Sequence, residues 1–138
     1  MLQSLKGGCL CGLVRYQLEG RLEFVANCHC SICRRSHGAS MASQAVIWDP
    51  TLHWISGFEE LTTYQATLGY HRSFCSRCGS RLINYPDNMA FVSLSINSVD
   101  NLQEGLLPSM HVYVGSKPAL FSICDSLPQH ALLPSGSD

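Results

Sequence analysis

The sequence predicts one mainly β domain with little helix, organised around bound zinc. Short segments rich in β-branched and aromatic residues recur along the chain, separated by Gly, Pro, Asn and Asp. Long apolar patterns with the 3.6-residue period of an amphipathic helix are missing. Seven of the eight cysteines also fall in close groups, which is typical of metal ligation.

Strands are expected, in chain order, at 13–18, 41–48, 62–65, 70–74, 81–85, 90–96 and 111–114. In the first of them Val14, Tyr16 and Leu18 alternate with a mixed polar set, which is the period of a half-buried strand. Two short helical turns are expected, at 31–37 and 98–102.

The length of 138 residues fits a single domain with a core of its own. No repeat or low-complexity linker divides the chain, so residues 1–138 are interpreted as one domain. Its core covers about residues 5–128, and 129–138 form a short, turn-rich C-terminal tail.

Charge and hydropathy exclude two classes of partner. The formal net charge is −1, charged residues make up 14% of the chain, and no basic run suited to nucleic acid occurs. No stretch of about 18 apolar residues is present, so we expect neither nucleic acid nor membrane as a partner. A cytoplasmic protein is the expectation.

The cysteine spacing favours metal sites over disulfides. Disulfides are rare in a reducing cytosol, and cysteines this close in sequence are poorly placed to bond to each other. The groups are Cys9-x-Cys11, Cys28-x-Cys30-x-x-Cys33 and Cys75-x-x-Cys78, with Cys124 alone. Cys124 has an Ile neighbour and is interpreted as a small buried apolar residue.

The first and last groups predict a closed zinc site. Both pairs lie in glycine-rich turns, and together they supply the four thiolates of a structural zinc tetrahedron. The ligands are Cys9, Cys11, Cys75 and Cys78. Such a site ties the first strand to a turn far along the chain, so its metal-binding energy becomes folding energy.

The middle group, Cys28, Cys30 and Cys33, predicts an open zinc site. Three protein ligands are the pattern of a reactive zinc, and a sulfur-rich zinc suits a substrate thiol as its fourth ligand. Two alternatives remain from spacing alone. Cys124 or a histidine could fill the fourth position, and Cys30 and Cys33 could pair with Cys75 and Cys78.

Three neighbours of the open site are candidates for further roles. Arg34 and Arg35 follow the cysteines directly, and either guanidinium could hold a substrate carboxylate. The alternative is that both arginines only solvate a turn. His37, one short turn further on, is the candidate for proton transfer.

With these motifs in view, the chain resembles the glutathione-dependent formaldehyde-activating enzyme family, which includes centromere protein V. The resemblance rests on Gly7–Tyr16, Cys28–Arg35 and Phe74–Ser80, and it extends to about Pro128. It implies an Mss4-like β fold. It also implies the partition of seven cysteines between a structural and a catalytic zinc that the spacing favours.

The resemblance further implies an activity. The family's namesake reaction joins glutathione to formaldehyde and is classed as a carbon–sulfur lyase. We therefore expect an enzyme that adds a small thiol, such as glutathione, to formaldehyde or another small aldehyde, or reverses that addition. The alternative is a non-catalytic zinc-binding module that binds a protein or peptide partner.

Overall fold

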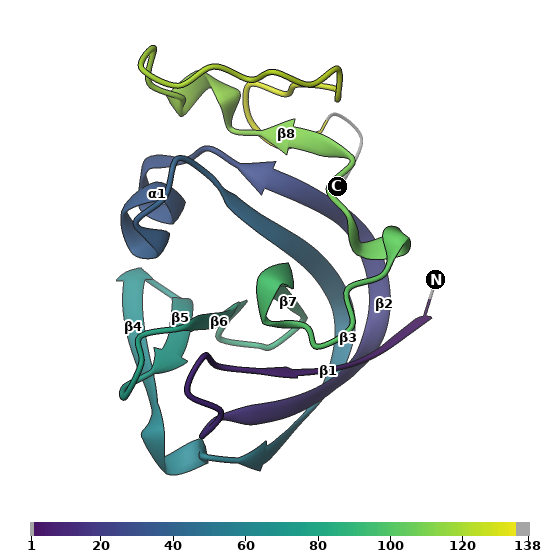
Figure 1. The fold of residues 1–138 in the computed structure, drawn as a ribbon, viewed down its shortest axis with the longest axis vertical. Coiled ribbons are helices and arrows are strands. Elements are labelled where there is room, and N and C mark those ends of the chain that lie inside the picture. Colours follow the sequence, from purple (N-terminus) through teal and green to yellow (C-terminus); the bar gives the residue numbers. More distant parts are fainter. Residues whose placement is uncertain (1, 135–138) are drawn as a thin grey trace.

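One curved β-sheet builds most of the molecule, which is described by a computed structural model covering residues 2–134. The strand order is β1-β2-β3-β7-β6-β5-β4, and β8 pairs with β2 on the other side. Every pairing is antiparallel except the parallel one between β2 and β8. Figure 1 shows β2 and β3 curving together along one side, with α1 and β8 near one end. The predicted mainly β fold is confirmed.

The strands are β1 Leu2–Gly8, β2 Arg15–Cys28, β3 Ala42–Ser56, β4 Leu61–Thr67, β5 Tyr70–Cys75, β6 Arg81–Pro86, β7 Phe91–Ser95 and β8 Met110–Val112. The one α-helix of residues 2–134 is α1, Ser31–His37. Short 3-10 turns lie at Phe58–Glu60, Ile96–Ser98, Glu104–Leu106 and Val114–Ser116. None of the described helices is long and apolar enough to cross a membrane.

The first strands differ from the sequence prediction in extent. Val14, Tyr16 and Leu18 are fully buried as the alternation predicts, but β2 begins at Arg15 and continues to Cys28. Strand β1 was not predicted, because its segment mixes Lys6 with two glycines. It forms by pairing along β2, so contact with a partner strand stabilises an extended conformation that the local sequence does not favour by itself.

The expected helical turn at 98–102 is wrong. A 3-10 turn occupies Ile96–Ser98 instead and ends there. Val99 has extended backbone and forms an isolated bridge to Gly7 in β1. Tertiary pairing with β1 therefore overrides the weak local helical pattern.

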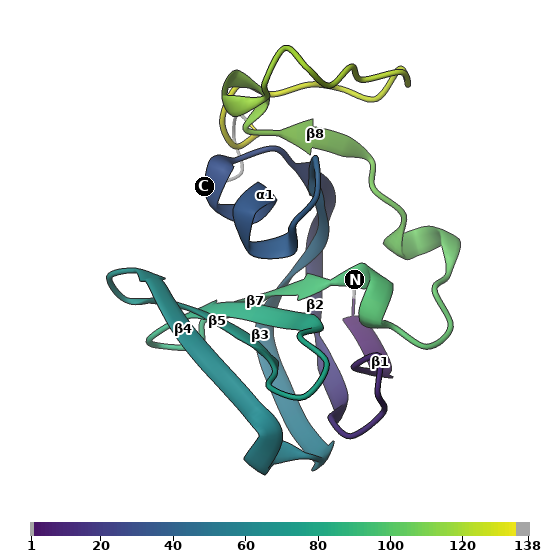
Figure 2. The same ribbon diagram turned by 60° about the vertical axis from the view of Figure 1, so that its left-hand side comes forward.

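Two groups of buried residues lie on different parts of the sheet. The larger includes Tyr16, Leu18, Ile47, Ile83 and Leu94, all almost fully buried. The smaller surrounds the second cysteine group and contains Ala26, Cys28, Cys33, Ala42 and Val112. This smaller set of buried residues joins the end of β2, helix α1 and β8, which lie close together in Figure 2.

Part of the expected tail is hydrogen-bonded to the region of β8. The N–H of His130 donates to the carbonyl of His111 at 2.9 Å, and the N–H of Tyr113 donates to the carbonyl of Leu132 at 3.0 Å. Residues 135–138 of the expected tail lie outside the described part of the chain.

Candidate metal centres

The structure brings four cysteines together from two distant turns. The sulfur atoms of Cys9, Cys11, Cys75 and Cys78 all lie within 4.8 Å of one another. Cys11 Sγ lies 3.6 Å from Cys9 Sγ and 3.9 Å from Cys75 Sγ. A tetrahedral zinc with Zn–S bonds of about 2.3 Å places its sulfur ligands about 3.8 Å apart. The spacing of these sulfur atoms therefore fits a tetrahedral ion.

Backbone turns hold these sulfur atoms in place. The N–H of Val14 donates to Cys9 Sγ at 3.3 Å, which partly compensates negative charge on that sulfur. On the other turn the N–H of Gly79 donates to the carbonyl of Cys75 at 2.8 Å. Gly79 has φ of 76°, in the left-handed region that glycine enters without steric cost. Ser80 Oγ lies 3.3 Å from Cys78 Sγ, and this hydrogen bond lowers the pKa of Cys78 to about 5.

A second group of three cysteines lies where β2 passes into α1. The sulfur atoms of Cys28, Cys30 and Cys33 are within 4.8 Å of one another. Cys28 ends β2, and Cys30 caps α1 by accepting a hydrogen bond from the N–H of Cys33 at 3.2 Å. Gly38 ends the helix with φ of 61°. One short helical turn therefore places three sulfur atoms around one point.

Three thiols this close disturb each other's ionisation. Hydrogen bonds from Cys28 and Cys33 lower the pKa of Cys30 to about 2. Donating to Cys30 raises the pKa of Cys28, because losing that proton would place a second negative charge beside the first. A cation at the centre would replace the shared protons and allow all three groups to be thiolates. The donor set therefore fits a soft divalent ion such as zinc.

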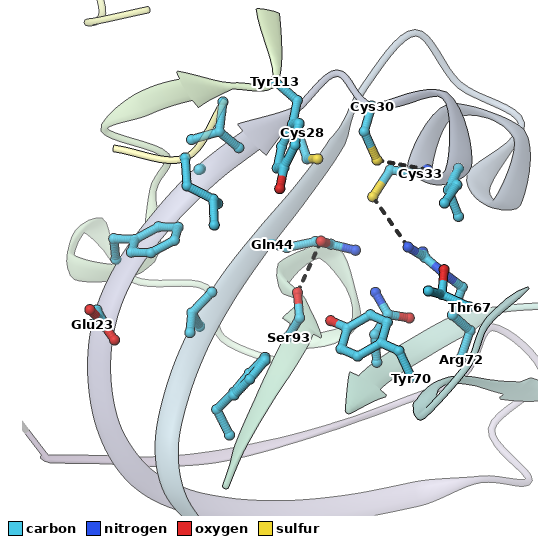
Figure 3. Close-up of a pocket in the computed structure, with 18 of the residues that line it drawn as sticks. Glu23, Cys28, Cys30, Cys33, Gln44, Thr67, Tyr70, Arg72, Ser93 and Tyr113 are labelled. Atoms are coloured by element: carbon cyan, nitrogen blue, oxygen red, sulfur yellow. Dashed lines mark hydrogen bonds between the residues drawn. The ribbon is translucent and has the colours of Figure 1, made fainter. Parts of the chain in front are cut away.

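A cavity of about 450 Å³ opens beside the three cysteines. All three line it, and no fourth cysteine of residues 2–134 joins their group. Cys124 is exposed, so its expected burial is wrong. Figure 3 shows Cys28, Cys30 and Cys33 along one side of this cavity, with Arg72, Tyr70 and Ser93 across from them. The free side of the cysteine group therefore faces a space large enough for a ligand.

One row of residues across the sheet forms part of the cavity lining. Register pairs Phe24 with Val46, Val46 with Ser93, Ser93 with Asn84, and Asn84 with Arg72. All five line the cavity. The row therefore runs from apolar side chains on β2 and β3 through polar ones to a cation on β5.

Arg72 is a charged lining residue that the sequence prediction missed. It is 6% exposed, and its Nη2 lies 3.7 Å from Cys33 Sγ. Its Nε and Nη1 are buried and have no hydrogen-bond partner among the described residues. The alternation of the 70–74 segment could have placed Arg72 on the same face as Tyr70, but nothing in it indicated contact with a cysteine.

His37 lies on a different cavity from the three cysteines. This second cavity, of about 950 Å³, also contains Arg35 in its lining. Gln44 lines the first cavity and connects the two: its Nε2 is 3.3 Å from His37 Nε2, while its Oε1 accepts from Ser93 at 2.9 Å. Burial, together with the positive charges of Arg72 and Arg81, lowers the pKa of His37 to about 4.

Arg34 makes contacts within the fold. Its Nε donates to the carbonyl of His29 at 3.0 Å, and its Nη2 donates to the carbonyl of Ser116 at 3.2 Å. Neither Arg34 nor Arg35 is among the described residues that line the first cavity. The predicted role of either arginine in holding a substrate stays a prediction.

A chain of hydrogen bonds reaches the cysteine loop from the C-terminal segment. Asp125 accepts from His111 Nε2 at 3.0 Å, and His111 Nδ1 lies 2.8 Å from His29 Nε2. With Nε2 of His111 donating, its Nδ1 accepts the proton of His29. Asp125 thereby fixes the ring of His29, which is buried and is not among the described residues that line the cavity.

Sheet and clusters together define a β protein with two groups of cysteines that could hold metal ions. Residues 4–116 match the glutathione-dependent formaldehyde-activating enzyme family. The chain therefore belongs to this family, as the sequence motifs indicated, and its fold is of the family's Mss4-like type.

Two of the known proteins to which this chain is similar show how far the likeness extends. A "putative glutathione-dependent formaldehyde-activating enzyme" from Halomonas elongata is 36% identical in an alignment over 84 residues, and the match covers 56% of this chain. The chain spans about half of that relative, since the match covers 54% of it. A crystal structure of a Rhodobacter sphaeroides protein has a TM-score of 0.57 at 25% identity, covering 72% of this chain and 92% of that one.

Proposed function

We propose that the protein is a zinc-dependent enzyme that joins a thiol to formaldehyde or another small aldehyde, or reverses that reaction. It would bind two zinc ions, one held by Cys9, Cys11, Cys75 and Cys78 and one held by Cys28, Cys30 and Cys33. Family membership and the name of the Halomonas relative support glutathione and formaldehyde as the first substrates to test.

The observation that carries this proposal is the shape of the second cysteine group. Three sulfur donors converge on one point, and the cavity occupies the side where a fourth ligand would approach. The four-cysteine group, by contrast, supplies a complete tetrahedron by itself. A closed site suits a structural role, and a three-donor site beside a cavity suits an exchangeable ligand.

The reaction needs one new bond and one proton transfer. The thiol sulfur attacks the carbonyl carbon, the C=O π bond breaks, and the proton lost by sulfur ends on the carbonyl oxygen as a hydroxyl. A bound zinc would favour the thiolate form of the substrate by offering its open coordination position. The cavity walls hold the two reactants close together and keep water away, which removes much of the entropic barrier.

His37 is the proposed acceptor and donor of the proton. Its lowered pKa keeps the imidazole neutral at pH 7, so its Nε2 can accept a hydrogen bond from Gln44, and a proton taken up by the ring would be passed on readily. Gln44 also lines the cysteine cavity, so its amide would link His37 to the reactants.

The test is a rate measurement with the zinc-loaded protein. Formaldehyde and glutathione should combine faster than they do spontaneously, and the excess should disappear after chelation and return with zinc. Cys33→Ser should abolish the excess rate. If neither glutathione nor cysteine nor other common thiols gives a zinc-dependent excess, the enzyme assignment is wrong.

A further inference from the structure

The cavity beside Cys28, Cys30 and Cys33 is much larger than formaldehyde needs. Its volume of about 450 Å³ lies in the range of about 300–1,000 Å³ that is typical of pockets for drug-sized ligands. Formaldehyde would leave most of that space unfilled. The size and chemistry of the lining therefore describe the larger of the two reactants, the thiol.

Most of the lining away from the cysteines is apolar. Phe24 and Val46 form one end of the cross-strand row, and Trp48 and Phe91 pair in the next row with ring centroids 5.1 Å apart. Surfaces of this kind favour an apolar or aromatic body, because burying it removes hydrocarbon from water. Peptide groups placed there would lose hydrogen bonds to water and would find few partners, the unpaired Nε1 of Trp48 being one of them.

The opposite end of the row carries an unused cation. Arg72 is nine-tenths buried, yet only its Nη2 has a partner, Cys33 Sγ at 3.7 Å. Leaving Nε and Nη1 buried without acceptors is costly, so these donors are suited to an anionic oxygen supplied by a ligand. Tyr70, whose ring lies 5.9 Å from the guanidinium carbon, helps to hold the group in this position.

The negative charge expected at the metal-bound cysteines also means that a carboxylate needs the cation Arg72 in order to bind beside them. Three thiolates and one divalent metal carry a net charge of −1, which repels a carboxylate. Adding the positive charge of Arg72 makes the unit neutral. The other charged group of the described lining, the exposed Glu23, lies at the far side of the cavity, as Figure 3 shows.

We propose that the thiol substrate of this pocket is a small mercapto acid with an apolar body, whose carboxylate is held by Arg72. The inference rests on the proposed function and specifies its substrate class. Because Arg72 contacts a metal-ligating sulfur, a carboxylate on Arg72 and a sulfur at the open coordination position must be only a few bonds apart. A 2-mercapto acid meets that condition, whereas the carboxylates of glutathione are further from its thiol.

The experiment measures binding by isothermal titration calorimetry on the zinc-loaded protein, without aldehyde. The main probe is 2-mercapto-3-phenylpropionate. Three probes each lack one feature: 2-phenylethanethiol lacks the carboxylate, thioglycolate lacks the apolar body, and 3-phenylpropionate lacks the thiol. The complete probe should bind at least about tenfold tighter than each of the three and than glutathione.

Two variants locate the carboxylate and the apolar body. Arg72→Met should weaken the complete probe about ten- to hundredfold and 2-phenylethanethiol, which lacks the carboxylate, much less. Val46→Phe, which fills the apolar end, should weaken the complete probe and leave thioglycolate unchanged. Arg72→Lys keeps the charge without the planar fork and should fall between wild type and Arg72→Met. Arg21→Met, an exposed arginine paired with Asp49, is the control that should bind like wild type.

Zinc content and melting temperature are measured on every variant, so that a folding defect is recognised. Should Arg72→Met fail to fold, Arg72→Lys and Val46→Phe still decide the matter. Equal binding of the complete probe and 2-phenylethanethiol, or tighter binding of glutathione, overturns the proposal. Binding as predicted without any thiol–aldehyde addition would contradict only the proposed function, so the two failures are distinguishable.

Discussion

The fold lowers the pKa of His37, and this change can be measured through the pH dependence of stability. Its ring is partly buried beside two guanidinium groups, and its pKa falls to about 4 from the usual value near 6.5. Between these two values the unfolded chain binds a proton at this residue and the folded protein does not. Stability from His37 is therefore fully present above about pH 6.5 and is lost as the pH falls towards 4.

We expect this dependence to appear as a difference between two variants. The free energy of unfolding of wild type, relative to His37→Gln, should fall as the pH drops from 7 to 4. Chemical denaturation at several pH values measures it. His53→Gln, on an exposed histidine of β3, is the control and should follow wild type across the range. A constant difference between wild type and His37→Gln would contradict a neutral, buried imidazole.

Residues of the candidate site differ in how far sequence could predict them. The cysteines could be predicted as ligands because their close spacing is typical of metal sites. Spacing left more than one partition open, the family resemblance favoured one of them, and the structure groups the sulfur atoms in those same two sets. Arg72 could not be predicted as a site residue, because its place in the cavity depends on the register across five strands, which local sequence does not encode. Arg34 and Arg35 were singled out by proximity in sequence, but adjacent side chains on a helix point in different directions.

Two kinds of element hold the two cysteine groups. Cys9 and Cys11 lie in the turn after β1, while Cys75 and Cys78 lie at the end of β5 and in the turn beyond it. The three-cysteine group instead occupies one continuous segment, from the end of β2 through the first turn of α1. A metal ion in the first group would therefore join distant parts of the chain, whereas one in the second group would stabilise one continuous segment.

Substitutions in the two groups should have different effects. Cys78→Ser leaves three ligands between distant segments and should give insoluble or unfolded protein, because structural zinc contributes on the order of 10 kcal/mol to folding. Cys33→Ser should leave the domain folded with roughly one zinc fewer. Zinc content and thermal melting of the two purified variants make the comparison.

The reverse result would exchange the roles of the two groups. If Cys33→Ser unfolds the protein while Cys78→Ser remains folded with one zinc, then the continuous segment holds the structural ion. Cys124→Ser, on an exposed cysteine outside both groups, is the matched control and should keep wild-type zinc content and melting temperature.

At the scale of the whole molecule, the order and curvature of the sheet bring together functional side chains that lie far apart in the sequence. β2 and β3 have shifts in register and curve together, so the end of β2 lies over the face formed by β7, β6 and β5 (Figure 1). The cavity occupies the space between them and is lined from both sides. This curvature is what places three cysteines opposite Arg72.

Sequence could predict the class of this fold but not its topology. Alternation and turn residues identified β5 and β6 nearly at their observed ends, and the helical pattern of 31–37 matches α1. The order β3-β7-β6-β5 and the parallel pairing of β8 with β2 arise from packing between segments far apart in the chain. Such pairings depend on the whole set of strands, so no single segment encodes them.

The central claim is that one zinc is fully coordinated by the protein while the other has a position that a thiol can take. Zinc K-edge X-ray absorption on the zinc-loaded protein, with metal content determined on the same sample, tests it most directly. We predict about two zinc ions per chain, with a mean number of sulfur neighbours per zinc between three and four that rises to four when a thiol substrate is added. Four sulfur neighbours before any thiol is added, no change on its addition, or the absence of zinc would contradict the claim.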